Sequence, residues 1–111
     1  MNLRELILDE CEIGDAGCIE ICESLMEAER DLILLDLSHN DIGKEGGIKI
    51  AALLEKNTNL QKLYLHNNKI GAEASENIAN GVKMNSVVTI LDLSYCHLGR
   101  RKLPKGEKSD E

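Results

Sequence analysis

The fold of this chain is decided by a stretch that occurs four times: LILLDLSHNDIG at residues 32–43, and three segments that align with it without gaps, LRELILDECEIG at 3–14, LQKLYLHNNKIG at 60–71 and VTILDLSYCHLG at 88–99. The copies begin 29, 28 and 28 residues apart. Each has apolar residues at its first, fourth, sixth and eleventh positions, Asn or Cys at the ninth, and Gly at the twelfth. Because sequence periods of about 20 to 50 residues mark stacked architectures, we expect four units placed one upon the next.

Each unit is predicted to be a short strand followed by a helix of about three turns. In the strand, apolar side chains alternate with residues that face solvent. After the glycine, apolar residues recur at intervals of three and four, which is typical of one face of a helix. Asn57, with Asn59 after it, and Asn85 lie where the helices should stop, and Asn tolerates left-handed conformations there. The three predicted helix stripes are Cys18-Ile21-Cys22-Leu25, Gly47-Ile50-Ala51-Leu54 and Ser75-Ile78-Ala79-Val82.

The units together predict an α/β solenoid with a right-handed path. Stacked units pair their strands in parallel, and a helix needs more lateral room than the roughly 4.8 Å between strands, so the sheet should line the concave side and the helices the convex side. The expected domain spans residues 1–99, with repeats at about 3–31, 32–59, 60–87 and 88–99, and residues 100–111 form a charged tail. Three full repeats and a closing strand result, because Pro104 follows too soon for a fourth helix.

At this point the sequence resembles the leucine-rich-repeat family, and its period of 28 to 29 residues with a following helix is similar to the ribonuclease-inhibitor-like subclass. The resemblance covers about residues 3–99. It implies that the chain binds another protein through the concave face and has no catalytic activity. It also implies that the Asn or Cys at the ninth position sits inside a turn and bonds neighbouring backbone, which assigns this role to Cys11, Asn40, Asn68 and Cys96.

The concave face is therefore the candidate site. Its aromatic residues are Tyr64 and Tyr95, the only aromatics of the chain, and exposed aromatic and apolar groups ringed by charge are usual interface anchors. The face also includes Glu10, Ser38, Asn67 and Ser94 among the positions expected to meet solvent. The residues assigned to partner binding are Ile7, Asp9, Leu34, Asp36, His39, Lys62, Tyr64, His66, Ile90, Asp92 and Tyr95.

Three other chemistries are weighed and set aside. Asp36 and Asp92 occupy the same strand position two units apart, and paired carboxylates at such range suit an inverting glycosidase, but an open sheet offers no pocket to raise the pKa of either carboxyl. His39 and His66, with Asp36 close by, are a weak signal for a metal site because a third ligand of fixed spacing is missing. Cys18 and Cys22 share one helix face, as two metal ligands would, but they align with core positions of the other repeats. We expect no enzyme activity, no metal and no cofactor.

Charge and composition limit the partners further. The net charge is -7, with nine acids and two bases in residues 1–30, and five bases against three acids in residues 99–111. The basic run at 100–102 with Lys105 and Lys108 is short, so nucleic-acid binding is not favoured over a solvated tail. No segment is apolar enough to cross a bilayer or to act as a secretory signal. The four cysteines are expected to be free, buried thiols, and the cytoplasm is the expected location.

The two ends of the stack raise the question of self-association. Leu6, Leu8, Ile21 and Leu25 should be exposed at one end, and Leu91 and Leu93 at the other, because each outer layer has only one neighbour. Free strand edges invite pairing, so a homo-oligomer through these uncapped ends is expected. Two alternatives to a partner-binding module remain open: a regulator of a small GTPase, since Ran GTPase-activating proteins share this repeat type, and a structural, self-assembling fragment of a longer protein.

Overall fold

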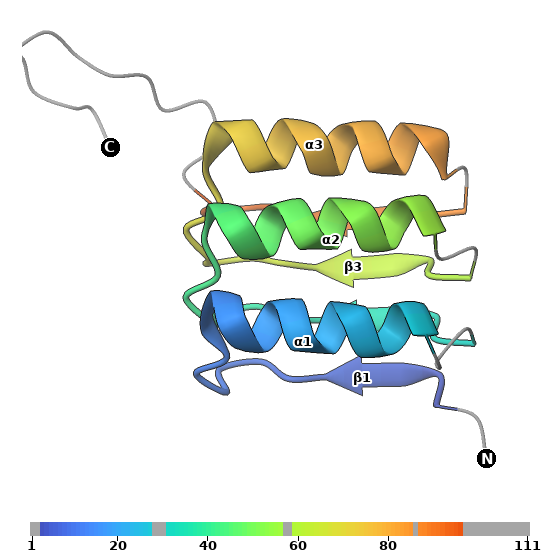
Figure 1. Ribbon diagram of the computed structural model, residues 1–111, viewed down its shortest axis with the longest axis horizontal. Helices are drawn as coiled ribbons and strands as arrows, with labels where there is room; N and C mark the ends of the chain where they lie inside the picture. Colours follow the sequence, from blue (N-terminus) through green and yellow to red (C-terminus); the bar gives the residue numbers. More distant parts are fainter. Residues whose placement is uncertain (1–2, 28–30, 57–58, 86, 97–111) are drawn as a thin grey trace, which may run out of the picture.

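The computed structural model describes residues 3–27, 31–56, 59–85 and 87–96 as a two-layered stack (Figure 1). The three helices lie side by side in one layer in chain order, and the strands form the second layer behind them. The elements follow one another as β1 (Glu5–Ile7), α1 (Gly14–Glu27), β2 (Leu34–Asp36), α2 (Lys44–Lys56), β3 (Lys62–Tyr64), α3 (Gly71–Met84) and β4 (Ile90–Asp92). The predicted α/β solenoid with repeated strand and helix units is confirmed.

The sheet is parallel, with its strands in the order β1-β2-β3-β4. The fourth position of the repeat motif pairs across all four strands, as Leu6 with Leu35, Leu35 with Leu63, and Leu63 with Leu91. Leu35 and Leu63 are fully buried because they have a strand on either side. Their flanking residues point to the opposite face of the sheet, which the helices do not cover. That uncovered face is the concave side.

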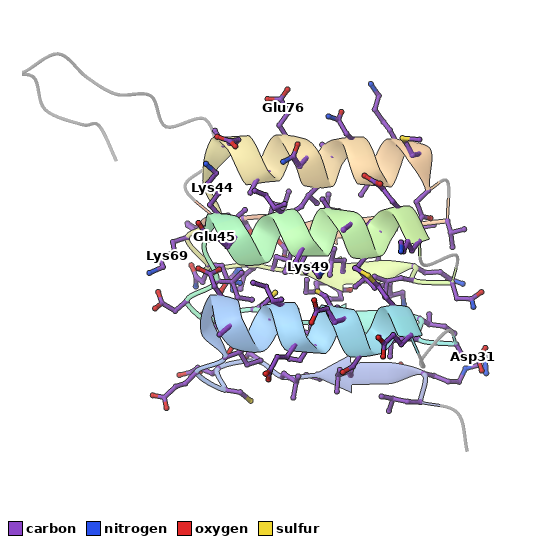
Figure 2. All side chains as sticks on the ribbon, viewed as in Figure 1. Asp31, Lys44, Glu45, Lys49, Lys69 and Glu76 are labelled. Carbon is purple, nitrogen blue, oxygen red and sulfur yellow. The ribbon has the colours of Figure 1, made fainter. Side chains whose placement is uncertain are left out.

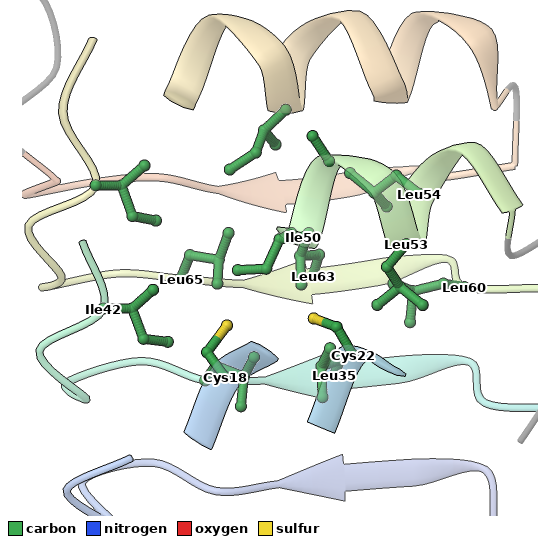
Figure 3. Close-up of a cluster of buried hydrophobic side chains, with 14 of the residues drawn as sticks. Cys18, Cys22, Leu35, Ile42, Ile50, Leu53, Leu54, Leu60, Leu63 and Leu65 are labelled. Carbon is green, nitrogen blue, oxygen red and sulfur yellow. The ribbon is translucent and has the colours of Figure 1, made fainter. Parts of the chain in front are cut away.

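The core fills the space between the sheet and the helix layer, as Figure 3 shows around Leu35, Leu63 and Ile50. Cys18 and Cys22 of α1 are completely buried there. Ala51 of α2, which has the same repeat position as Cys22, is also buried. Ala79, at the same repeat position in α3, is exposed because α3 has a helix neighbour on one side only among the described residues. The helix stripes are thus correct, with burial that depends on place in the stack.

A ladder of buried amides ties each turn to the turn before it. The Oδ1 atom of Asn68 accepts hydrogen bonds from the backbone N–H groups of Asn40 (2.9 Å) and Ile42 (3.0 Å). Its Nδ2 atom donates to the carbonyls of Leu37 and Leu65, both at 3.0 Å. Asn40 repeats the pattern one unit earlier, with its Oδ1 accepting from the Cys11 N–H at 2.7 Å. These side chains use their whole hydrogen-bonding capacity on backbone, as the family resemblance implies.

Cys96 continues this ladder, whereas Cys11 does not, and the expectation for Cys11 is wrong. The Cys96 thiol is buried and donates to the Leu65 carbonyl at 2.8 Å, the atom that Asn68 also contacts. Cys11 is exposed, and its thiol reaches only the Asp9 carbonyl of its own turn at 3.5 Å. The reason is that the described chain places no earlier turn beside Cys11 whose carbonyls it could contact.

This difference between the cysteines predicts their reactivity. Iodoacetamide at neutral pH is expected to modify the folded protein once, at Cys11, because Cys18, Cys22 and Cys96 are buried. A hydrogen bond with the Cys18 thiol, followed by burial, raises the pKa of Cys22, and burial raises the pKa of Cys96, so these groups stay as unreactive thiols. Intact-mass spectrometry would count the adducts. All four cysteines should react in denaturant, and rapid modification of a second cysteine in the folded protein would contradict the prediction.

The start of α1 makes hydrogen bonds with the start of α2 that the repeat pattern does not predict. Asp15, in the first turn of α1, accepts hydrogen bonds from the backbone N–H groups of Gly43 (2.7 Å) and Gly46 (2.9 Å) at the start of α2. The first N–H groups of a helix have no partner within it, and a carboxylate near them is favourable. Asp15 therefore caps the neighbouring helix. The aligned residues Lys44 and Ala72 cannot do the same.

Three further expectations need correction. Ser38 is 4% exposed rather than solvent-facing, and its Oγ accepts the His66 N–H at 3.1 Å. Leu25 is buried rather than exposed at the end of the stack. Asn85 ends α3 with φ −97°, outside the left-handed region, and its Nδ2 donates to the Leu54 carbonyl at 2.7 Å instead.

The remaining end-layer residues, Leu6, Leu8, Ile21, Leu91 and Leu93, are half-buried and pack against the core rather than being fully exposed. The expectations for Asn57 and for the tail at 100–111 lie outside the described residues.

Candidate functional site

The uncovered face of the sheet is organised in two rows that run across all four strands. One row pairs Glu5, Leu34, Lys62 and Ile90, and the other pairs Ile7, Asp36, Tyr64 and Asp92. The residues of β2 and β3 are half-buried between their neighbours, whereas Ile7 is 59% and Ile90 is 40% exposed on the outer strands. The predicted face therefore exists as a mixed apolar and charged surface, with apolar side chains at each side of it.

Asp36 and Asp92 serve the turns at the ends of their strands. The Oδ1 of each accepts the backbone N–H of the residue two places later, from Ser38 and Ser94, at 3.0 Å in both cases. The hydroxyl of Ser94 also donates to Asp92, and this bond, followed by the backbone bond, lowers the pKa of the Asp92 carboxyl. A general acid needs a raised pKa. The geometry thus gives Asp92 a turn-forming role and no feature of a glycosidase acid.

Where the strands end, polar side chains from successive turns contact one another. His39 Nδ1 lies 2.8 Å from Asp9 Oδ1, and His39 Nε2 lies 2.6 Å from Asn67 Nδ2. A neutral ring with its proton on Nδ1 donates to Asp9 and accepts from Asn67, so it satisfies both partners. The His39 and His66 rings meet edge to face with centroids 4.7 Å apart, and His66 meets Tyr95 in the same way at 6.0 Å. Four repeats thus form one continuous polar and aromatic row.

The structure corrects one part of the metal hypothesis. His39 and His66 are neighbours as predicted, but the carboxylate that reaches His39 belongs to Asp9 and not to Asp36. Among the described residues, no group of three or more His, Cys, Asp and Glu side chains is placed to hold a metal ion. The two imidazoles instead contact each other at the edge of the face.

A conformational feature of the turns was missed by the sequence analysis. Glu10, His39, Asn67 and Tyr95 stand at the same position of successive repeats, and their φ angles are 59°, 57°, 58° and 58°. The left-handed region is uncommon for residues other than glycine, with Asn the most tolerant among these four. Asn67 and His39 carried a weak signal, since Asn and His are enriched in this region, whereas Glu10 and Tyr95 carried none. The side chains of all four residues line one hollow at the ends of the strands.

These turns line an open, shallow hollow of about 570 Å³ beside the concave face. It lies at the end of the molecule where the helices begin, on the side where Figure 2 labels Lys69. Lys69 is ion-paired with Asp41 at 3.2 Å. The lining residues are Glu10, His39, Asp41, Asn67, Asn68, Lys69 and Tyr95. Of these, His39 and Tyr95 were assigned to partner binding from the sequence.

The repeat geometry agrees with the comparison with known families. A family model described as Leucine Rich repeat matches residues 1–22, 30–51, 56–79 and 85–100. This chain belongs to the leucine-rich-repeat family. Its repeats are of the ribonuclease-inhibitor-like type, and the leucine-rich-repeat fold is generally a non-catalytic interaction fold.

The similar curated proteins are much longer than this chain. The chain is 34% identical over 103 residues to mouse NACHT, LRR and PYD domains-containing protein 12, covering 92% of this chain and 10% of that protein. It is 36% identical over 100 residues to bovine Tonsoku-like protein, covering 87% and 7%. Pig ribonuclease inhibitor is 34% identical over 70 residues, covering 63% and 15%. The chain thus spans a small part of each of these relatives.

Among solved structures, the chain resembles that of Leiomodin-1 Actin-Binding Site 2. The TM-score is 0.73 with 20% sequence identity, over 78% of this chain and 50% of that chain. At this identity the likeness establishes the shared fold. Within the described ranges, α1, α2 and α3 are all too short and too polar to span a membrane.

Proposed function

We propose that this chain is a non-catalytic module that binds a partner protein through its concave face. The observation that carries the proposal is a set of apolar and aromatic side chains among charged groups: Ile7, Tyr64 and Ile90 on the uncovered face, and Tyr95 in the adjoining turn. Tyr95 is 77% exposed, and a large exposed aromatic side chain is an effective interface anchor. Half-buried neighbours hold the surrounding side chains in place, which lowers the ordering cost of binding.

The net charge of the concave face indicates which kind of partner surface it would attract. Its strand and turn positions carry five acids, Glu5, Asp9, Glu10, Asp36 and Asp92, against two bases, Arg4 and Lys62, which leaves a net charge of -3. The whole chain is also acidic, at -7. A partner with a basic surface would be attracted to this face, and complementary charge speeds association more than it strengthens the final complex.

The size of the face sets the expected affinity. Four strands about 4.8 Å apart and about five residues long give a patch of a few hundred Å². A standard interface buries about 800 Å² on each partner. The sheet alone therefore supports weak binding, and a tighter complex needs the adjoining turns. The hollow beside His39 and Tyr95 has a volume of about 570 Å³, and the recess lined by Arg4, Asp31, Ile33, Asn59 and Gln61 is smaller, at about 220 Å³.

Capture of proteins from a cell lysate, compared between matched variants, tests the proposal. A concave variant would carry Ile7→Ala, Tyr64→Ala and Ile90→Ala. We expect the recovery of a specific partner, quantified by mass spectrometry, to fall about tenfold or more, since a few anchor residues carry most of the binding energy of an interface.

The matched control changes three exposed helix residues, Ile48→Ala, Glu76→Ala and Lys83→Ala. Circular dichroism of both triple variants would establish that each is folded. Equal recovery of every captured protein by the concave variant and the helix-face variant would refute the role of the concave face.

We propose as a second property that copies of the chain associate through their outer layers. Leu6 and Leu8 in one outer layer, and Leu91 and Leu93 in the other, are only half-buried, so stacking would cover them further. Light scattering should show an apparent mass that rises with concentration. A compact monomer at high micromolar concentration, in both low and high salt, would contradict it.

The four free thiols fit a reducing compartment such as the cytoplasm.

A further inference from the structure

The hollow at the strand ends spans the whole width of the sheet. Glu10 lines it from the first repeat, His39 from the second, Asn67 from the third and Tyr95 from the fourth. Three strand spacings of about 4.8 Å separate the outer two, so the row is roughly 14 Å long. A partner segment in extended conformation advances about 3.3 Å per residue and covers this length with residues i and i+4.

Most polar groups that line the hollow already have partners within the chain. His39 uses one ring nitrogen on Asp9 and the other on Asn67. Asn68 is buried, with its amide spent on four backbone groups. Lys69 and Asp41 neutralise each other. These groups therefore have little hydrogen-bonding capacity or charge left with which to bind a ligand.

The two ends of the row differ from the middle. Among the described residues, the Glu10 carboxylate has no hydrogen bond or ion pair, and the Asp9 carboxylate behind it adds a second negative charge. Tyr95 contacts the ring of His66 edge to face and leaves most of its own surface open, with 77% exposed. One end thus offers an unpaired carboxylate and the other an open aromatic ring. Both are groups that attract cations.

We propose that this hollow binds an extended basic segment of the partner, with one arginine at Glu10 and a second, four residues along, against the Tyr95 ring. The inference rests on the proposed partner-binding function and names the chemistry recognised beside the concave face. Arginine fits both ends, because its planar guanidinium pairs with a carboxylate through two hydrogen bonds and stacks on aromatic rings, whereas lysine is a compact and strongly hydrated charge. An acidic segment would meet Glu10 unpaired and find Lys69 already neutralised by Asp41.

A titration of the isotope-labelled protein with the peptide acetyl-Arg-Gly-Ser-Gly-Arg-amide, followed by NMR, tests the inference. We expect saturable shifts of the backbone amides of Glu10, His39, Asn67 and Tyr95, with an affinity that falls in high salt because exposed charge pairs are screened. The Glu10→Gln and Tyr95→Asn variants should each weaken binding by about threefold or more, the size expected for exposed ion and cation–π pairs. Asn suits position 95 because Asn67 has the same φ at the same repeat position.

The control variant is Glu20→Gln, which removes one exposed acid from α1 outside the hollow. An equal loss of affinity in Glu20→Gln and Glu10→Gln would overturn the inference, since attraction to overall charge would then explain the binding. Two further peptides replace both arginines, one with lysine and one with glutamate. If the lysine peptide bound as tightly as the arginine peptide, the assignment to arginine would be overturned. If the glutamate peptide bound as tightly, the whole inference would be overturned.

The peptide titration needs only the purified chain, so its outcome is separable from that of the lysate capture. An unchanged capture profile of the concave variant refutes the concave-face function. An unchanged peptide affinity of Glu10→Gln refutes peptide binding in the hollow.

Discussion

Replacing Asn68 with alanine is expected to lower the free energy of unfolding by roughly 3–5 kcal/mol, because each buried polar group left without a partner costs about 1–3 kcal/mol. Asn68 is 3% exposed, and its amide holds the N–H groups of Asn40 and Ile42 and the carbonyls of Leu37 and Leu65. Alanine supplies none of these bonds, and of the four backbone groups the Leu65 carbonyl alone keeps another side-chain partner among the described residues, the Cys96 thiol. Urea unfolding followed by circular dichroism would measure the change.

Two further variants sharpen this measurement. Asn80→Ala removes an exposed amide from α3 and should change the stability by less than about 0.5 kcal/mol. Asn68→Cys should be less damaging than Asn68→Ala, because the aligned Cys96 thiol donates to a carbonyl of the preceding turn. If Asn68→Ala were no more destabilising than Asn80→Ala, the amide ladder would not be the structural tie between repeats.

Replacing Gly47 with leucine is expected to destabilise the stack by roughly 1–3 kcal/mol, the usual effect of overfilling a packed site. Gly47 lies on the side of α2 that packs against the first turn of α3. A Cβ atom built on it would lie 2.8 Å from the Cβ of Ala74 and 2.9 Å from Cγ2 of Ile70. Neither neighbour can withdraw freely, since both are buried. Thermal or urea unfolding would report the loss.

A matched substitution separates crowding from helix propensity. Ala72→Leu places the same side chain on an exposed position of α3 and should be almost neutral. In addition, Ala74→Gly should recover part of the stability lost in Gly47→Ala, because it removes the nearer of the two close atoms. Additive effects in the double variant Gly47→Ala/Ala74→Gly would show that the two residues do not compete for space.

The strands and their register could be predicted from the sequence because they depend on a pattern that each repeat carries in full. Leu35 and Leu63 are buried by neighbours of the same kind, so the period of 28 residues contains the information. Cys11 was misassigned for the complementary reason. Its sequence position matches Asn40 and Asn68, yet its environment depends on which turn lies beside it, and a residue's own repeat does not encode that.

The candidate site was predictable as a surface and only partly as a set of contacts. Alternation along the strand placed Tyr64 and Ile90 on the uncovered face, because the side-chain period of a strand is two. The bond from His39 to Asp9 was missed because it joins the turns of two successive repeats at different repeat positions, so the repeat pattern does not pair these residues. Asp15 capping α2 was missed because one repeat alone has this acid.

The direction of the amide ladder has a consequence for how such a chain can change its length over evolution. Each buried Asn contacts the turn that precedes it, so a duplicated segment of 28 residues brings with it the side chain that joins it to the older part of the stack. The residues on the uncovered face take no part in that junction. Duplication can therefore widen the recognition surface by one strand at a time, while mutation is free to rewrite the chemistry of each added strand.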